Sequence, residues 1–209
     1  MICPLCLNNK TDDLAVHPKG HQFFSCSKCK LLFKHNSHWP NWVEQKKIYD
    51  QHENIVEDKR YQNYLTKTLN PLLDFISDQM VGLDFGCGPS KGAETLLGQK
   101  GFICSSYDAI YFDDKKLLTN KYDFIIANEV VEHFQSPEKE FQRIYNMLKS
   151  GGILALRTEL APKSIENWWY LNDPTHIVFY CQETLNFIAE IFNLSIVFQL
   201  GPVSLFRRN

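Results

Sequence analysis

The sequence predicts an α/β fold in which a parallel sheet is flanked by helices, with a small cysteine-rich module in front of it. The first observation is the apolar run at 81–85, which breaks into a glycine-rich turn at 86–88 and then into a helical segment at about 90–100. A strand, a glycine turn and a helix in this order make a nucleotide-binding corner of an α/β sheet. The second observation is a pair of Cys-x-x-Cys motifs, at 3–6 and 26–29, which predicts a metal-binding module before the sheet.

Length and composition set the outer limits. At 209 residues the chain can hold one full domain and a small accessory module. It contains no run of about 18 apolar residues, so no membrane span is expected. Its first residues lack the charged and apolar regions of a signal peptide, and we therefore expect a cytoplasmic protein. A net charge of −2 does not favour a general nucleic-acid binder.

The two Cys-x-x-Cys motifs predict a zinc ribbon. Nineteen residues separate them, and four thiolates in two such pairs suit tetrahedral Zn²⁺. A redox disulfide pair is the alternative, but two motifs in a chain expected to be cytoplasmic favour metal. Four cysteine ligands leave no open coordination position, so the zinc is expected to be structural. The predicted ligands are Cys3, Cys6, Cys26 and Cys29.

The chain divides into three predicted parts. These are a zinc ribbon at 1–40, a helical cap or linker at 41–79, and the α/β domain at 80–209. In the middle part, Pro71 is expected to start the last helix, because proline suits the first helical position.

The α/β part is expected to alternate strands and helices. Ser90 can cap the helix after the first strand, because its hydroxyl can accept from the free N–H groups there. A terminal antiparallel pair is expected around the turn at 201–202. The strands after the first are expected at 102–108, 122–127, 153–157, 195–199 and 203–207.

Polar residues follow two of the expected strands. Asp108 ends the second strand, 24 residues after Asp84, where an acid can accept hydrogen bonds from both ribose hydroxyls of a nucleotide. A simple turn at the strand end is the alternative role for Asp108. Asn128 and Glu129 follow the central strand, and ligands of open α/β sheets bind at this end.

Three motifs in order resemble those of class I S-adenosylmethionine-dependent methyltransferases. Asp84, two residues before Gly86, resembles the acid of the first motif, while segment 122–133 resembles the fourth motif and segment 149–154 the turn into strand five. The resemblance implies a Rossmann-like sheet with S-adenosylmethionine as cofactor. The residues then expected at the cofactor are Asp84, Gly86, Cys87, Gly88, Asp108, Ala109, Asn128, Glu129 and Val130.

The chain departs from this family after Asp108. Only 12 residues, Ala109 to Asn120, stand where a typical member has a helix and a third strand. Leu117 and Leu118 are the candidates for what remains of that strand, so this edge of the sheet is expected to be short.

The acceptor side is expected to involve two histidines. The resemblance puts Glu132 and His133 close to the transferred methyl, and His176 comes from the loop after the strand at 153–157. One imidazole is expected to orient the acceptor or take its proton, because imidazole titrates near neutral pH. His176 is favoured because it follows aromatic residues at 168–170 that could form a substrate wall; the alternative is that these rings cap the sheet core. The pattern at 173–180 also resembles a subgroup that carries an N-terminal zinc ribbon.

The helical part before the sheet can contribute to the same pocket, because such helices cover cofactor and substrate in many members of the family. A solvated helix face is the alternative for each of its polar residues. The candidates are Tyr49, His52, Asn54, Tyr61 and Tyr64.

The predicted function is transfer of a methyl group to an O, N or C atom of a small-molecule acceptor. One alternative is an RNA methyltransferase, which would need a basic face joining Lys28, Lys30 and Lys34 to the mouth of the pocket. Another alternative is a non-catalytic protein that binds the cofactor without turnover.

Overall fold

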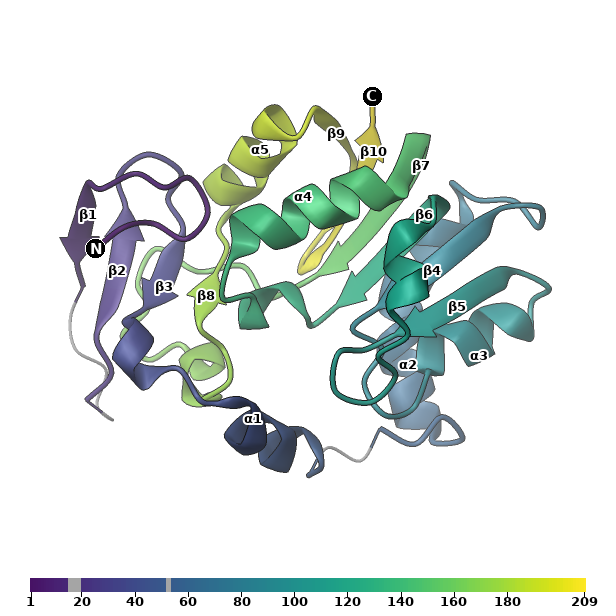
Figure 1. Cartoon of the computed structure of the whole chain (residues 1–209), viewed down its shortest axis with the longest axis horizontal. Helices are drawn as coiled ribbons and strands as arrows, with labels where there is room; N and C mark the ends of the chain where they lie inside the picture. The colour runs from purple at the N-terminus through teal and green to yellow at the C-terminus, as the bar shows by residue number, and fades with distance from the viewer. Residues whose placement is uncertain (15–19, 52–53) are drawn as a thin grey trace.

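The computed structural model describes residues 1–14, 20–51 and 54–209. Its centre is a six-stranded sheet with the strand order β5-β4-β6-β7-β10-β9 (Figure 1). The first four strands in this order are parallel, and β10 and β9 close the sheet as an antiparallel pair. The predicted α/β class is confirmed. The strands are β4 (Val81–Phe85), β5 (Ile103–Tyr107), β6 (Tyr122–Asn128), β7 (Leu148–Arg157), β9 (Leu194–Leu200) and β10 (Val203–Arg208).

Helices cover both faces of this sheet because its central strands are apolar on both sides. Along β6, Phe124 and Ile126 pack with residues of α2 (Lys59–Leu73) and α3 (Gly92–Gly98). The alternate residues, Ile125 and Ala127, pack on the other face with residues of α4 (Pro137–Met147) and α5 (Gln182–Ile191). Figure 1 shows α4 and α5 crossing this face. Among the described residues, no helix is long and apolar enough to cross a bilayer.

Helix α2 passes through Pro71, so the prediction that Pro71 begins a helix is wrong. Leu65, Leu69 and Leu72 form one buried stripe against the sheet, and this burial favours a continuous helix. Pro71 lies in the last turn, where its missing N–H costs one hydrogen bond at most.

The predicted cap at Ser90 is also wrong. Helix α3 begins after Lys91, whose backbone is left-handed with φ +49° and whose side chain makes no capping bond. The Ser90 hydroxyl lies 3.0 Å from the Tyr61 hydroxyl, so it joins the turn before α3 to α2 instead.

The sheet ends at β5, as the short segment after Asp108 predicted. Leu117 and Leu118, the candidates for a remaining strand, lie in the 3-10 helix η2 (Lys115–Thr119). Asp114 accepts the Lys116 N–H at 3.1 Å, and the Tyr122 hydroxyl donates to the Leu117 carbonyl at 2.8 Å. These local bonds favour a turn where a strand would have needed a partner.

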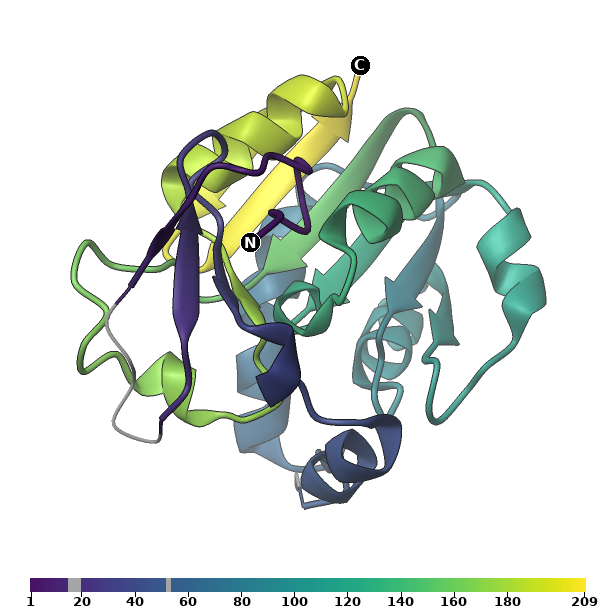
Figure 2. The ribbon, with the colours of Figure 1, turned by 60° about the vertical axis from the view of Figure 1, so that its left-hand side comes forward.

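A second, small sheet has the order β1-β2-β3-β8 and includes the predicted ribbon strands. In Figures 1 and 2 it lies on the side of the molecule that carries α5. Its last strand, β8, directly follows the segment 173–177, which contains His176, and Phe33 of β3 pairs with Val178. The predicted domain boundary at residue 40 stays a prediction. Backbone hydrogen bonds join residues before this boundary to residues after it. The strands are β1 (Thr11–Asp13), β2 (Phe23–Cys26), β3 (Leu32–Lys34) and β8 (Val178–Phe179).

Between the ribbon and α2 lie a 3-10 turn, η1 (Asn36–His38), and the helix α1 (Trp42–Tyr49). A capping box fixes the start of α1: the Asn41 side chain accepts from the Glu44 N–H, and the Glu44 carboxylate accepts from the Asn41 N–H at 2.8 Å. The start of this helix is therefore set by its own sequence.

Candidate active site

A cavity of about 760 Å³ lies at the carboxyl ends of β5, β4 and β6, and the loop after β7 also lines it. This volume is in the range of small-molecule and cofactor sites, roughly 300–1,000 Å³. All the residues predicted to bind the cofactor line it, and so do both candidate histidines. They are Asp84, Gly86, Cys87, Gly88, Asp108, Ala109, Asn128, Glu129, Val130, His133 and His176.

The glycine loop has the backbone that only glycine adopts without strain. Gly86 has φ +80° and Gly88 has φ +62°. A Cβ at Gly86 would also lie 2.5 Å from a methyl of Val130. The N–H groups of Gly86 and Cys87 donate to the Tyr107 carbonyl at 2.8 and 3.1 Å, so the loop is tied to the end of β5.

Asp108 organises the loops on both sides of the cavity wall. Its Oδ2 accepts the Gly88 N–H at 2.9 Å, while Oδ1 accepts those of Ile110 and Tyr111 at 2.8 and 3.1 Å. The turn at the strand end is thus present. A carboxylate has about four acceptor positions, so the three backbone bonds leave capacity on Oδ2 for a ligand hydroxyl.

Asp84 is buried under the glycine loop. Burial raises the pKa of its carboxyl to about 7, and the carboxylates of Glu94 and Asp108 act in the same direction. Cys87, next to the loop, also has a raised thiol pKa because of burial, so it is not an activated nucleophile.

The end of β6 holds its polar residues in fixed positions. The Thr68 hydroxyl of α2 donates to Asn128 Oδ1 at 2.7 Å, which leaves the Asn128 amide nitrogen to donate to a ligand. Glu129 has φ +56°, a strained backbone for a residue with a side chain. Arg157 from the end of β7 donates to Glu129 Oε1 at 3.1 Å.

Two carboxylates meet at the Tyr170 hydroxyl. It donates to Glu129 Oε2 at 2.8 Å and also lies at hydrogen-bond distance from Glu132 Oε1. Glu132 comes from the 3-10 helix η3 (Val131–His133) and is fully buried. Burial and the Glu129 carboxylate raise the pKa of Glu132 well above its usual range.

The two candidate histidines face each other, with ring centroids 5.0 Å apart. His133 Nδ1 lies 2.9 Å from the Thr175 carbonyl oxygen, and His176 Nδ1 lies 2.9 Å from that of Tyr170. A carbonyl only accepts, so Nδ1 carries the hydrogen and Nε2 of each neutral ring carries the lone pair. His176 Nε2 is 3.8 Å from Asp173 Oδ2. Burial lowers the His176 pKa, with Asp173 acting against it.

The aromatic residues at 168–170 are expected either to form a substrate wall or to cap the sheet core, and in the structure two of them line the cavity and one packs in the core. Trp169 is 62% exposed and lines the cavity together with Tyr170, which belongs to the same 3-10 turn, η4 (Trp169–Asn172). Trp168 packs edge-on against Phe179, with ring centroids 5.6 Å apart, and belongs to the core.

The helical part contributes to the cavity as the resemblance implied. Tyr49, Asn54, Tyr61 and Tyr64 line it, while His52 lies outside the described residues. Sequence reasoning missed Trp42 and Gln45 of α1, which also line it, and Arg157, which does not line it but donates to Glu129. Only the place of Arg157 at the end of a strand could have indicated it.

The four predicted zinc ligands form one cluster, with their sulfur atoms within 4.8 Å of one another. Cys3 Sγ lies 3.5 Å from Cys29 Sγ, and Cys6 Sγ lies 3.5 Å from Cys26 Sγ. A tetrahedral zinc with bonds of about 2.3 Å needs sulfur atoms roughly 3.8 Å apart, so the cluster fits the metal. The hydrogen bond from Cys29 lowers the pKa of Cys3 to about 5. The cluster is consistent with a zinc ribbon.

The basic face required for RNA binding is incomplete. Lys34 is fully buried, and its ammonium donates to the Pro174 carbonyl at 3.2 Å. Lys28 and Lys30 are exposed on the ribbon.

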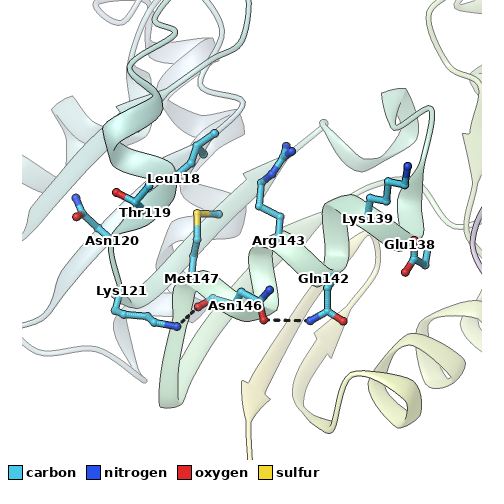
Figure 3. Close-up of a pocket in the computed structure, with 10 residues that line it drawn as sticks. All are labelled: Leu118, Thr119, Asn120, Lys121, Glu138, Lys139, Gln142, Arg143, Asn146 and Met147. Atoms are coloured by element: carbon cyan, nitrogen blue, oxygen red, sulfur yellow. Dashed lines mark hydrogen bonds between the residues drawn. The ribbon is translucent and has the colours of Figure 1, made fainter.

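Another depression, of about 470 Å³, lies between η2 and α4 (Figure 3). On its wall the Gln142 amide donates to Asn146 Oδ1 at 3.1 Å. None of the predicted site residues lines it.

Comparison with solved structures supports the fold. A SAM-dependent methyltransferase from Archaeoglobus fulgidus has a TM-score of 0.54 at 16% identity, covering 71% of this chain and 94% of that one. A second is 1,6-didemethyltoxoflavin-N1-methyltransferase from Burkholderia thailandensis, solved with 1,6-didemethyltoxoflavin and S-adenosylhomocysteine. Its TM-score is 0.56 at 11% identity, covering 95% of this chain and 99% of that one. At these identities the likeness shows the fold alone.

The family model described as "Methyltransferase domain" matches residues 58–199, more than half of the chain. No curated protein matches the sequence significantly. The matched residues include the glycine loop, Asp108, the end of β6 and both histidines of the cavity. The chain therefore belongs to the methyltransferase domain family and is an S-adenosylmethionine-dependent methyltransferase of class I.

Proposed function

We propose that this enzyme transfers a methyl group to an O, N or C atom of a small molecule bound in the 760 Å³ cavity. The observation that carries the proposal is that the predicted cofactor residues and the two histidines line this one cavity. Bound S-adenosylmethionine supplies an electrophilic methyl group on a positively charged sulfur. The task of the protein is to hold the acceptor in line with that methyl.

The order of the strands gives the cavity a direction. Asp108 stands at the end of β5, the glycine loop at the end of β4, Glu129 at the end of β6, and His176 in the loop after β7. With Asp108 at the ribose, the cofactor extends from β5 towards β6. The acceptor then occupies the end of the cavity near β6 and β7.

The cofactor end supplies groups of the chemistry that S-adenosylmethionine needs. The remaining acceptor position on Asp108 suits one ribose hydroxyl, and the buried Asp84 carboxyl suits the positive amino group of the methionine end. The Asn128 amide nitrogen offers a donor, because Thr68 already occupies its oxygen. Gly86 and Gly88 let the backbone approach the cofactor closely.

The acceptor end contains His133 and His176. Either imidazole can orient the acceptor or take its proton, because Nε2 of each neutral ring carries the lone pair. His176 remains the favoured residue: Asp173 lies 3.8 Å from its Nε2 and can stabilise a positive charge there.

A small acceptor is favoured over RNA. Lys34, which the RNA interpretation requires on an exposed basic face, is buried. Trp42 and Trp169 supply exposed rings at the cavity, which suit a small planar or apolar group.

Zn²⁺ held by Cys3, Cys6, Cys26 and Cys29 has a structural role in this proposal. Four thiolate ligands complete a tetrahedron and leave no position for a substrate.

The test is calorimetric titration with S-adenosylmethionine and with its demethylated product. We expect saturable binding of one equivalent of each. Absence of binding by the folded wild type would refute the proposal. Binding without methyl transfer to any member of a broad small-molecule panel would favour the non-catalytic alternative.

A further inference from the structure

We propose that a divalent transition-metal ion binds between Glu132, His133 and His176, at the acceptor end of the cavity. This inference rests on the proposed function for its role, but the site itself is argued from the side chains. Each of the three residues offers one ligand atom, and these atoms lie within 4.8 Å of one another. Two imidazoles and a carboxylate are a ligand set of divalent transition metals.

The backbone holds the two segments of the site together. Glu132 and His133 belong to η3, and His176 lies directly before Ile177, whose N–H donates to the Glu132 carbonyl at 2.9 Å. The bond between His133 Nδ1 and the Thr175 carbonyl is a second link between these segments. The ligands are therefore fixed by hydrogen bonds of the fold.

Both imidazoles have the support that metal-binding histidines have. In each ring Nδ1 donates to a backbone carbonyl, of Thr175 for His133 and of Tyr170 for His176, at 2.9 Å. Such a bond fixes the tautomer that leaves Nε2 as the ligand atom. His176 Nε2 also lies 3.8 Å from the Asp173 carboxylate. The imidazole lone pair and the carboxylate are both acceptors, so a cation bound at Nε2 would be stabilised by Asp173.

Glu132 provides an independent observation. Its side chain is fully buried, and among the described residues its Oε2 has no hydrogen-bond partner. A buried carboxylate oxygen without a donor is costly. The Glu129 carboxylate is also close, since both carboxylates lie at the Tyr170 hydroxyl, and Arg157 is bonded to Glu129 and not to Glu132. A bound cation would satisfy Oε2.

Metal binding would draw the three ligand atoms closer together. Two ligands of one tetrahedral metal with bonds of about 2.1 Å lie roughly 3.4 Å apart. The ligand atoms here lie within 4.8 Å of one another, so their side chains would rotate inward when the metal binds.

A metal at this site defines the acceptor class. Three protein ligands leave coordination positions open, and the histidines line the cavity. A metal-bound hydroxyl has a lowered pKa, so the acceptor would carry an alcohol or phenol group. With the Nε2 lone pairs of both histidines on the metal, neither imidazole would act as the base. The hydroxyl would lose its proton to solvent, and its oxygen would form the new C–O bond as the methyl–sulfur bond breaks. The products are a methyl ether and S-adenosylhomocysteine.

The test is titration of the full chain, with its zinc ribbon already loaded, by Co²⁺ followed in the visible spectrum. We expect one further equivalent of Co²⁺ with the weak d–d bands of nitrogen and oxygen ligands, and without the intense sulfur-to-cobalt absorption of a cysteine site. His176→Ala and Glu132→Gln should each weaken this binding at least tenfold. His38→Ala, in η1 outside the cluster, is the matched control and should leave it unchanged.

A melting curve of each variant shows whether it is folded, and His133→Ala replaces any variant that is not. Absence of a further equivalent on folded wild type, or unchanged affinity in the folded cluster variants, would overturn the metal site. Because S-adenosylmethionine binding is titrated separately, failure of the metal site would leave the proposed methyl transfer standing. If Co²⁺ bound but S-adenosylmethionine did not, the metal site would stand and the proposed methyl transfer would be refuted.

Discussion

The backbone N–H of Lys34 donates a hydrogen bond of 2.8 Å to the carbonyl oxygen of Ile177, the residue after His176. Lys34 ends the last strand of the ribbon, and its ammonium also donates to the Pro174 carbonyl. The ribbon therefore supports the segment that carries His176 from behind. This arrangement links the cysteine cluster to the acceptor end of the cavity.

Loss of zinc should therefore affect the acceptor end more than the cofactor end. We expect elemental analysis to find about one Zn²⁺ per chain, and Cys26→Ser to lower it. In that variant, amide hydrogen exchange should rise at 174–180, while S-adenosylmethionine affinity stays within a few-fold. Cys104→Ser, a cysteine of β5 outside the cluster, is the control. A folded, metal-free wild type would contradict the zinc assignment.

Asp108→Ala should weaken S-adenosylmethionine binding by about 2–3 kcal/mol, or roughly 30- to 150-fold, because a charge-assisted hydrogen bond to the ribose is lost. Part of the loss will come from the glycine loop, since Asp108 also holds the Gly88 N–H. Calorimetry with a melting curve separates the two effects. The control Asp78→Ala removes an exposed carboxylate outside the cavity. It should change neither the cofactor affinity nor the melting temperature. Unchanged affinity in Asp108→Ala would remove this residue from the site.

Asp84→Asn should stabilise the cofactor-free protein at neutral and higher pH. The Asp84 pKa of about 7 lies above the usual value of about 4, so the folded state disfavours the ionised form. The free energy of unfolding of the wild type should thus fall as pH rises from about 4 to 7, by at most about 4 kcal/mol. Denaturant titrations of both proteins between these pH values measure the difference. If the difference in unfolding free energy between Asp84→Asn and the wild type were largest at low pH, the predicted direction of the Asp84 effect would be wrong.

His176→Ala should lower turnover by about 100-fold or more once an acceptor is known, as expected for a group that acts on the reacting atoms. Cofactor affinity should stay nearly unchanged, because His176 lies beyond β7, away from Asp108 and the glycine loop. His38→Ala again serves as the control. An equal loss of cofactor binding would move His176 to the cofactor end.

Gly86→Ala should destabilise the protein by about 1–3 kcal/mol and weaken cofactor binding, because φ is +80° and the new Cβ would lie 2.5 Å from Val130. Gly98→Ala is the matched control: no described atom lies within 4 Å of its Cβ position, and Gly98 is helical. That change should be neutral or stabilising by up to about 1 kcal/mol. Equal melting temperatures for the two variants would contradict the strain argument.

The parts of the fold that local chain chemistry controls could be predicted from the sequence. The run at 81–85 forms a buried strand because its apolar residues have no polar face, and Gly86 and Gly88 then adopt the left-handed turn that other residues resist. The spacing of Cys3, Cys6, Cys26 and Cys29 likewise brings four sulfur atoms together through two short turns. In the glycine loop and in each cysteine motif, the residues that form the sequence pattern are also the residues that form the local structure.

Tertiary contacts decided the rest. Pro71 continues a helix because Leu65, Leu69 and Leu72 are buried against the sheet, and Ser90 bonds to Tyr61, which is distant in sequence. The leucines of α2 and Ser90 contact residues far away in the sequence, and a local sequence pattern does not identify such contacts.

The acceptor end shows the same division most clearly. The sequence indicated His133 and His176 separately, through their places after two strands. Their approach to 5.0 Å follows from the bond between Ile177 and Glu132 and from the ribbon strand behind it. Sequence alone determined which chemical groups this protein has at the ends of its strands. Only the tertiary structure decided which of them share one cavity, because that depends on contacts between segments far apart in the chain.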